Sequence, residues 1–284
     1  MEQKRHTFLN IVILVIVIIT ALFLYAKYIG VKGLIVKEYR IQNNSLPSNF
    51  SGVKIVHFSD LLYKSTVTND DVVKLIDKIN LYKPDIVVFT GDLVNKNINL
   101  KEKDKLFLIE QLSNITATIG KYAIYGDYDY YLKDYENIMT ESGFTILDNN
   151  YEELYYKANE SIYLVGLPSS KKSTIKIDES FKFYDVNNRK WTILLIHDGN
   201  TIKYLDNSDY EVDLILGGHS LNGSVVLPYY GGLFIDKYSY KYYDAYYQKG
   251  ITDIYISSGI GTNNYKYRFN NKPSINVYRL KAQS

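Results

Sequence analysis

The strongest pattern of apolar positions lies near the N-terminus, where residues 8–26 are interrupted by only three more polar residues. As a helix that rises 1.5 Å per residue, this run would span about 28 Å, close to the thickness of the hydrocarbon core of a bilayer. No second run of this kind occurs later in the sequence. The pattern predicts one transmembrane helix over about residues 8–26, within an N-terminal tip and anchor at residues 1–27.

A cleaved signal peptide is the alternative explanation of this run, but its apolar region would be shorter and would precede a small-x-small cleavage site. Residues 22–27 read Leu-Phe-Leu-Tyr-Ala-Lys, which favours an uncleaved anchor. Basic residues flank the run on both sides, and a simple count would leave the following domain in the cytoplasm. Long domains translocate largely regardless of such charges, so we expect a domain on the extracellular side.

After the anchor, the apolar pattern predicts a connector followed by one domain with both strands and helices. Glycine, asparagine and proline punctuate residues 28–52, which indicates a connector and lead-in strand rather than a long helix. Residues 53–58 form an apolar β-rich run, and residues 85–90 form another. Between them we expect a helix that is capped by Asn69, buries Val72, Ile76 and Ile79 on one face, and ends before Pro84. Residues 53–284 should form the domain.

The alternation of strand and helix patterns continues along the chain. A helix is expected around residues 108–115 and another at 132–142, with strands at 122–125 and 144–147. Later strands are expected at 161–166, 192–196, 213–216, 253–257 and 275–280. The first half is therefore βαβα, which predicts parallel strands covered by helices, and the second half is mostly strands.

Five acidic or imidazole side chains come directly after apolar strands, and most of them neighbour a glycine. They are Asp60, Asp92, Asp127, His197 and His219. Each one alone would be explained as a cap or turn residue. Open α/β sheets bind their ligands at the ends of strands, so the five together predict one shared site.

Composition narrows the function classes. The net charge of +2 does not indicate a broad basic face for nucleic acid, and the absence of cysteine excludes disulfides, thiolate metal sites and cysteine nucleophiles. The 30 tyrosines are spread along the chain and cluster only at 229–247, which favours a compositional bias over a set of stacking platforms. His57, within the first strand, is interpreted as structural, and His6 lies in the basic tip.

The five residues stand in motifs that resemble the calcineurin-like metallophosphoesterase family, especially its membrane-associated bacterial branch. In chain order the motifs read Asp60-Leu61-Leu62, Gly91-Asp92, Gly126-Asp127-Tyr128-Asp129, His197 and Gly218-His219-Ser220-Leu221. The flanking stretches 46–52, 257–262 and 268–269 resemble that branch as well. The resemblance covers roughly residues 35–284 and implies a four-layer α/β/β/α sandwich with the site between its two sheets.

The resemblance also implies two metal ions that share Asp92, but this sequence departs from the family's ligands. The first ion would bind Asp60, Asp92 and two histidines whose places are taken by Leu62 and Leu221. Leucine offers no lone pair, so we expect this ion to be lost and Asp60 to remain as a residual ligand. The paired replacement suggests that the two leucines pack together and close that half of the site.

The second ion would bind Asp92, Asp127, His197 and His219, all of which can act as ligands. Mixed imidazole and carboxylate donors suit Mn, Zn or Fe, so we expect one divalent ion. The family's acid histidine is replaced by Tyr128, whose phenol is a poor acid at neutral pH. Losing one ion and this histidine predicts weak or absent phosphohydrolase activity.

Three functional interpretations remain open. The chain could be a degenerate phosphoesterase that binds or regulates at a membrane, contacting lipid through its N-terminal helix and a phosphate-containing ligand through its site. It could instead be an active phosphohydrolase with one metal or a remodelled site, acting on a membrane-associated phosphoester or pyrophosphate. In the third interpretation no metal binds, and the Asp and His groups form a salt-bridged polar core with charged histidines.

Overall fold

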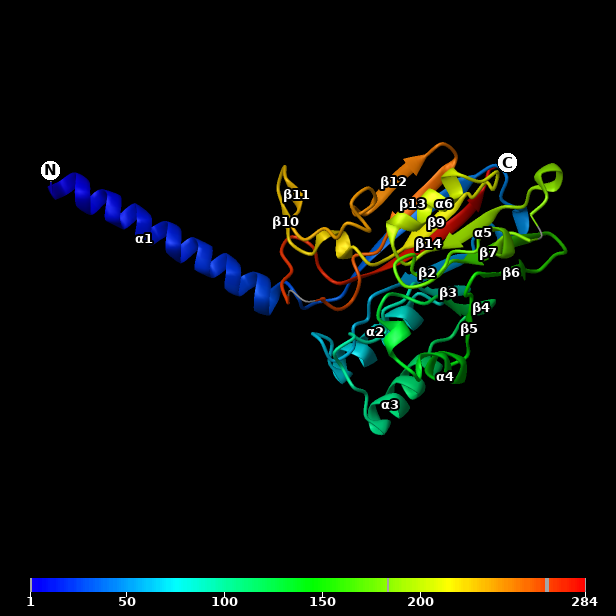
Figure 1. The fold of residues 1–284 in the computed structure, drawn as a ribbon, viewed down its shortest axis with the longest axis horizontal. Coiled ribbons are helices and arrows are strands. Elements are labelled where there is room, and N and C mark those ends of the chain that lie inside the picture. Colours follow the sequence, from blue (N-terminus) through cyan, green and yellow to red (C-terminus); the bar gives the residue numbers. More distant parts are fainter. Residues whose placement is uncertain (1, 183, 264–265, 284) are drawn as a thin grey trace.

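The computed structural model describes residues 2–182, 184–263 and 266–283, which build an α/β domain with one long N-terminal helix projecting from it (Figure 1). Two six-stranded sheets form the centre of the domain. The first sheet has the order β1 (Ile35–Asn43), β14 (Ser274–Ala282), β2 (Lys54–Phe58), β3 (Ile86–Phe89), β4 (Gly120–Ala123), β5 (Phe144–Ile146). The second has the order β12 (Tyr246–Lys249), β13 (Thr252–Ile256), β9 (Leu214–Gly217), β8 (Thr192–Leu195), β7 (Ser161–Gly166), β6 (Asn150–Tyr155).

Helices cover the outer face of each sheet, which makes four layers. The first sheet is covered by α2 (Asn69–Leu81), α3 (Glu102–Ser113) and α4 (Tyr135–Glu141), and the second packs with α5 (Ile177–Ser180) and α6 (Ile202–Asp206). Three apolar clusters fill the spaces between the layers, and the middle one joins the two sheets through residues such as Ile55, Val88 and Leu195. The predicted α/β/β/α sandwich is therefore confirmed.

Strand direction agrees with the sequence pattern. The strands β2, β3, β4 and β5 run parallel to one another, as the βαβα pattern predicted, because α2, α3 and α4 connect each of them to the next. The strand β14 returns antiparallel to β2, and β1 lies parallel to β14 at the edge. Residues 35–43, predicted as part of the connector, thus form a strand of the first sheet.

One local expectation is corrected by one residue. The cap of α2 is Thr68 and not Asn69, since the Thr68 hydroxyl accepts a hydrogen bond from the Asp71 amide at 3.3 Å and the Asp71 carboxylate accepts one from the Thr68 amide at 2.9 Å. This reciprocal pair satisfies two amides at once, which a single asparagine cap does not. Asn69 instead accepts a hydrogen bond from the Tyr63 hydroxyl.

Several short elements have no counterpart in the sequence expectations. They are β6, β12, the hairpin β10 (Val226–Leu227) with β11 (Gly231–Gly232), and single turns at Ser48–Phe50, Asp129–Tyr131, Val186–Asn188, Gly199–Thr201 and Leu221–Gly223. These segments are too short for a periodic pattern to be read.

The N-terminal helix α1 (Glu2–Leu24) continues into one π-helical turn, Tyr25–Ile29. The most apolar window of Gln3–Ile29 has a mean hydropathy of 2.9, and none of that window is buried. The helix is therefore long and apolar enough to cross a membrane. Its end is attached to the domain, because the Arg268 amide donates to the Ala26 carbonyl at 2.9 Å and the Phe23 and Tyr267 rings lie 5.0 Å apart.

His57 is structural, as predicted. It is fully buried in β2, with Nε2 2.9 Å from the Thr90 hydroxyl and Nδ1 3.4 Å from the Tyr278 hydroxyl. Burial without a charged partner lowers the pKa of His57 to about 3.

This burial predicts a loss of stability in mild acid. The unfolded chain binds a proton at His57 near pH 6.5 and the folded chain does not, so the free energy of unfolding falls as pH falls below that value. Between pH 7 and pH 5 the loss from this one group should be about 2 kcal/mol. Urea unfolding in EDTA at both pH values should show it, and His57→Gln should reduce the pH dependence by that amount. Equal pH dependence in the two proteins would contradict the assignment.

Candidate metal centre

The five polar residues at the strand ends do meet at one place. Asp60, Asp92 and Asp127 come after β2, β3 and β4 of the first sheet, and His197 and His219 come after β8 and β9 of the second. All five are buried. The carboxylates thus come from one sheet and the imidazoles from the other, so the site exists only where the two sheets meet.

Asp92, His197 and His219 form the tightest group, with one potential ligand atom from each lying within 4.8 Å of the others. His197 Nε2 lies 3.5 Å from Asp92 Oδ2 and 3.3 Å from His219 Nδ1. His197 Nδ1 lies 2.7 Å from the Thr90 carbonyl oxygen, which can only accept, so Nδ1 carries a proton. In the neutral ring, Nε2 is then left with its lone pair directed into the group, as in histidines that ligate metals.

The backbone around Asp92 is held by Asp129, a residue to which the sequence reasoning gave no role. Its carboxylate accepts hydrogen bonds from three amides, those of Asp92, Leu93 and Gly126, each at 2.8 Å. Asp92 itself has φ 62°, and its Oδ1 accepts from the Tyr128 amide at 2.7 Å. This network fixes the direction of the Asp92 side chain without any metal, so the ligand position is built by the fold.

Asp127 lies beside this group and is held by cationic and hydroxyl neighbours. Its Oδ2 is 2.8 Å from Lys171 Nζ and 3.6 Å from His219 Nδ1, and its Oδ1 accepts a hydrogen bond from the Ser169 hydroxyl. Burial opposes its ionisation, but the neighbouring histidines and Lys171 lower the pKa of Asp127 to about 2. Asp127 is therefore an ionised carboxylate at the edge of the group, already neutralised in part by a lysine.

Lys171 and Asp236 were not expected from the sequence. Lys171 comes after β7 and its ammonium also lies 3.7 Å from Asp236 Oδ2, while Asp236 Oδ1 lies 3.8 Å from His219 Nε2. Neither residue stands in a motif of glycine and histidine, and each reaches the site from a loop. The only sequence signal was that Lys171 comes after an apolar strand, as the five expected residues do.

The carboxylates surrounding the two imidazoles favour positive charge in this cluster. Burial opposes protonation of His197, but the charges of Asp92, Asp127 and Asp60 raise its pKa well above the ordinary value. Burial likewise opposes protonation of His219, and the nearby Asp236, Asp127 and Asp92 raise its pKa. The same field attracts a divalent ion, which would replace protons on the imidazoles.

The half of the site around Asp60 is apolar. Leu62 and Leu221 are buried, at 0% and 3% exposure, and the glycine-containing loop after β13 lies against both. A Cβ on Gly259 would come within 2.4 Å of Leu221, and one on Gly261 within 2.6 Å of Leu62 Cβ. Asp60 Oδ2 accepts a hydrogen bond from the His219 amide at 3.0 Å, so this carboxylate also has a partner within the protein.

The backbone at both leucines is strained. Leu62 has φ 46° and Leu221 has φ 50°, a left-handed conformation that is uncommon for bulky residues. Asp60, Asp92 and His219 share positive φ values, of 48°, 62° and 64°. Such strain is typical of functional sites, where surrounding structure maintains it. The loop geometry that directs side chains into the site is present at the leucine positions too, although their side chains cannot act as ligands.

Tyr128 borders the site, as expected, and is mostly buried. Its hydroxyl donates to Asn263 Oδ1 at 2.6 Å, and burial together with the charge of Asp92 raises the pKa of Tyr128 to about 12. The phenol therefore remains neutral and can donate a hydrogen bond, but it is a weaker acid than free tyrosine.

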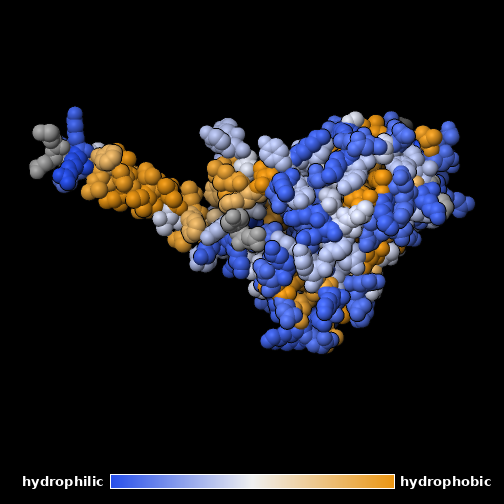
Figure 2. Space-filling view, in the orientation of Figure 1, coloured by the Kyte–Doolittle hydropathy of each residue, from blue (hydrophilic) through white to orange (hydrophobic). Residues whose placement is uncertain are grey.

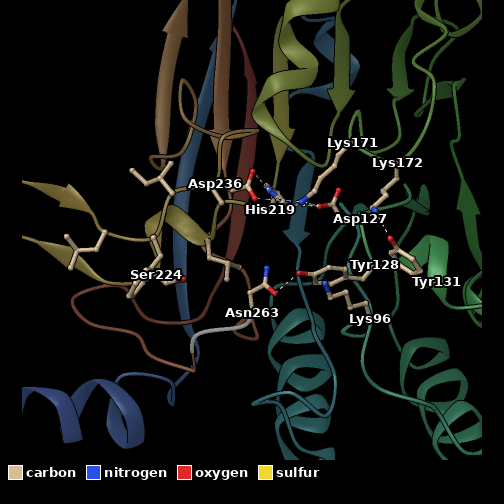
Figure 3. A pocket seen from close by; sticks show the side chains of 15 residues that line it. Lys96, Asp127, Tyr128, Tyr131, Lys171, Lys172, His219, Ser224, Asp236 and Asn263 are labelled. Atoms are coloured by element: carbon tan, nitrogen blue, oxygen red, sulfur yellow. Dashed lines mark hydrogen bonds and ion pairs between the residues drawn. The ribbon is translucent and has the colours of Figure 1, made fainter.

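A cavity of about 420 Å³ opens next to His219. Figure 3 shows Asp127, Lys171, Asp236 and His219 meeting at its inner end, with Tyr128 and Asn263 paired across it. Its volume is in the range of small-molecule sites. A ligand in this cavity would therefore contact the edge of the candidate metal group.

The order of the motifs and this two-sheet arrangement match one family. A model of the calcineurin-like phosphoesterases matches residues 53–223. The chain belongs to this family.

Among curated relatives, the Bacillus subtilis protein described as uncharacterized metallophosphoesterase YkuE is 32% identical over 261 residues, covering 91% of this chain and 89% of the relative. A Danio rerio transmembrane protein with metallophosphoesterase domain is 22% identical, covering 75% of this chain and 50% of the relative. The UDP-2,3-diacylglucosamine pyrophosphatase LpxG of Chlamydia trachomatis is 25% identical, covering 66% and 70%.

Calcineurin-like phosphoesterases depend on divalent metals, and the residues of this chain fit one such ion. Asp92, His197 and His219 supply one carboxylate and two imidazoles, a donor set that suits Zn, Mn or Fe. His219 Nδ1 is the nitrogen that faces this group, 3.3 Å from His197 Nε2, while its Nε2 lies 3.8 Å from Asp236 Oδ1. Leu62 and Leu221, which are buried beside Asp60, have no atom that can coordinate a metal.

Proposed function

We propose that this chain is a membrane-anchored metallophosphoesterase-like protein that binds one divalent ion and a phosphate-containing ligand, with weak or absent hydrolysis. The observation that carries the proposal is the pair of buried leucines, Leu62 and Leu221, on strained backbone where the family places ligands. A second ion would have two carboxylates, Asp60 and the shared Asp92, and no imidazole. The paired-ion stabilisation of an in-line transfer is then missing.

The residues that remain are suited to binding. A single ion on Asp92, His197 and His219 would act as a Lewis acid towards a phosphoryl oxygen. Lys171 places an ammonium at the same cavity, where it can contact an anionic ligand. Tyr128 can donate a hydrogen bond to such a ligand but protonates a leaving group poorly, because its pKa is raised to about 12.

A second function is supported by the fixed orientation of the candidate metal ligands. Thr90 and Asp129 already orient His197 and Asp92, so the one-ion site is preorganised and could support hydrolysis with a single metal. The substrate would then be a membrane-associated phosphoester or pyrophosphate. The Chlamydia trachomatis relative, whose name states a pyrophosphatase, supports this candidate at the level of chemistry.

The anchor is part of the same proposal. The most apolar window of Gln3–Ile29 contains no buried residue, and the helix is attached to the domain at the buried Ala26, which favours a retained anchor over a cleaved signal. We place the domain on the extracellular side, in line with the expectation from the sequence, because a single N-terminal anchor commonly exports the domain attached to it. Accessibility of an introduced cysteine to a membrane-impermeant reagent in intact cells would test the side.

Metal analysis of the purified full chain in detergent, loaded with Mn or Zn, tests the proposed function. We expect about one ion per chain, no ion in His197→Ala, and an unchanged count in the control His6→Ala. At an ion concentration one hundred times the dissociation constant, the free energy of unfolding should rise by about 2.7 kcal/mol. Hydrolysis of generic phosphodiesters and phosphomonoesters should stay close to background.

Each other outcome has a distinct meaning. Robust metal-dependent turnover that His197→Ala abolishes would overturn the binding function and establish the one-metal enzyme. No bound ion up to about millimolar concentration, with no change in melting temperature, would leave the polar-core interpretation and remove both metal functions.

A further inference from the structure

The cavity beside His219 has two walls of different chemistry. One wall carries three lysines, Lys96, Lys171 and Lys172. The other is formed by residues 233–235, Leu-Phe-Ile, which come after the hairpin β10–β11. Figure 3 shows the lysines reaching the cavity from segments near Asp127 and Tyr128. A ligand that fills this space would meet positive charge on one side and hydrocarbon on the other.

The basic wall carries more positive charge than the described acidic residues beside it neutralise. Lys171 is paired with Asp127 and Asp236, but Lys96 and Lys172 take part in no ion pair with any residue in the described ranges. Lys172 donates to the Tyr131 hydroxyl, which keeps its ammonium at the cavity. Unpaired ammonium groups beside a metal centre favour a phosphate, because Lys binds phosphate as a point charge.

Phe234 of the apolar wall also lines a second space, which lies against the N-terminal helix. This groove has a volume of about 280 Å³ and a lining of apolar and aromatic residues. The helix side is Leu22, Phe23 and Ala26, and the domain side is Val225, Leu227, Phe234, Tyr267 and Phe269. Phe234 lines both spaces, so the cavity and the groove share a wall.

The groove lies where a bilayer would meet the domain. The end of the apolar helix is fixed to the domain by the Ala26–Arg268 hydrogen bond and by the Tyr25 and Phe269 rings, whose centroids are 6.0 Å apart. Figure 2 shows the hydrophobic surface of α1 reaching the adjoining part of the domain. Tyr229 and Tyr230, at the tip of the β10–β11 hairpin, are strongly exposed, and tyrosine is enriched at membrane interfaces.

We infer that the ligand of this site is an anionic membrane lipid, with its phosphate at the lysine wall and an acyl chain in the groove along α1. The inference rests on the proposed function, since it assigns a class of ligand to the same centre. A soluble phosphate compound would use the lysines but leave the groove without an occupant, whereas a lipid matches both walls. The groove begins on the membrane helix itself, so the lipid enters from the bilayer without crossing water.

Native mass spectrometry of the full chain, released from non-ionic detergent micelles, tests the inference. The probes are dioleoyl phosphatidic acid, dioleoylglycerol, which has the chains without the phosphate, and glycerol 3-phosphate, which has the phosphate without the chains. We expect one phosphatidic acid per chain and a preference of about tenfold or more over each other probe, because only this probe engages both walls.

Two pairs of variants separate the walls. Phe234→Ser should reduce phosphatidic acid retention at least several-fold and leave glycerol 3-phosphate unchanged, whereas Lys172→Gln should weaken both phosphate probes. The matched controls Leu81→Ser and Lys74→Gln alter exposed residues of α2 and should change neither. Equal retention of phosphatidic acid and dioleoylglycerol, or equal loss of both phosphate probes in Phe234→Ser, would overturn the inference.

The same spectra report the bound metal, so the two proposals fail separately. One ion per chain without any preference for phosphatidic acid would remove the lipid ligand and leave the proposed function in place. Preference for phosphatidic acid without a metal would remove the proposed function and retain the lipid site.

Discussion

Replacing Leu62 and Leu221 together by histidine is expected to convert the proposed one-ion site into a two-ion site. Both side chains are buried next to the loop that borders Asp60, and both already have the left-handed backbone of the strained site. Two imidazoles would complete a ligand set with Asp60 and Asp92. A second ion supplies several kcal/mol of transition-state stabilisation, so hydrolysis of a generic phosphodiester should rise about 100-fold.

Metal analysis and steady-state kinetics of the double variant check this result, which requires two ions per chain and a higher rate. The matched control is the double variant with phenylalanine at both positions, which adds flat rings without a lone pair and should show neither change. A gain in the phenylalanine pair would attribute the effect to repacking rather than coordination. Two tightly held ions in the unaltered chain would contradict the premise.

Adding Tyr128→His to the histidine pair tests the second departure from the family. General acid catalysis typically contributes about 10²–10⁴-fold, so this triple variant should be faster than the double variant if Tyr128 is the other limit on turnover. The Tyr128 hydroxyl donates to Asn263 Oδ1 at 2.6 Å, a contact that the shorter histidine side chain would not make.

Replacing Arg268 by methionine is expected to cost about 3 kcal/mol or more of the free energy of unfolding. Arg268 is fully buried, and its guanidinium donates to the carbonyl oxygens of Ser258, Gly259 and Gly261 at 2.7, 3.2 and 2.6 Å. Each carbonyl left unpaired in the interior costs about 1–3 kcal/mol. Burial lowers the pKa of Arg268 to about 10, so the group stays charged at neutral pH and strengthens these bonds.

The change should also weaken metal binding, because Arg268 holds the loop that borders the site. The Gly261 amide donates to the Asp60 carbonyl at 2.8 Å, and the Arg268 amide donates to the end of the membrane helix. Chemical unfolding and metal titration of the same preparation measure both effects. Arg279→Met is the matched control, since Arg279 is half exposed and forms an ion pair with Glu38 at 2.9 Å, a contact worth less than about 1 kcal/mol. Similar losses in the two variants would refute the role of the buried guanidinium.

Part of the site's arrangement could be predicted from the sequence, because parallel strands must end at one edge of their sheet. The apolar pattern places Asp60, Asp92 and Asp127 at the end of one sheet, and His197 and His219 at the end of the other. Only the packing of the two sheets brings these two sets of side chains together. The long apolar N-terminal helix could also be predicted, since length and composition alone make it a candidate membrane span. The left-handed backbone conformation of Leu62 and Leu221 could not be predicted, because nothing in the composition or the residue spacing indicates it.

Tertiary structure alone decided which side chains from separate loops reach the site. Lys171 and Asp236 lie 65 positions apart in the sequence, after β7 and after β11, and meet beside Asp127 and His219 because the fold brings these loops together. The apolar groove along α1 depends in the same way on the hydrogen bond between Ala26 and Arg268, residues that are far apart in the sequence. Local sequence determines where a strand ends and which chemical groups come next, but contacts between distant loops depend on how the two sheets pack.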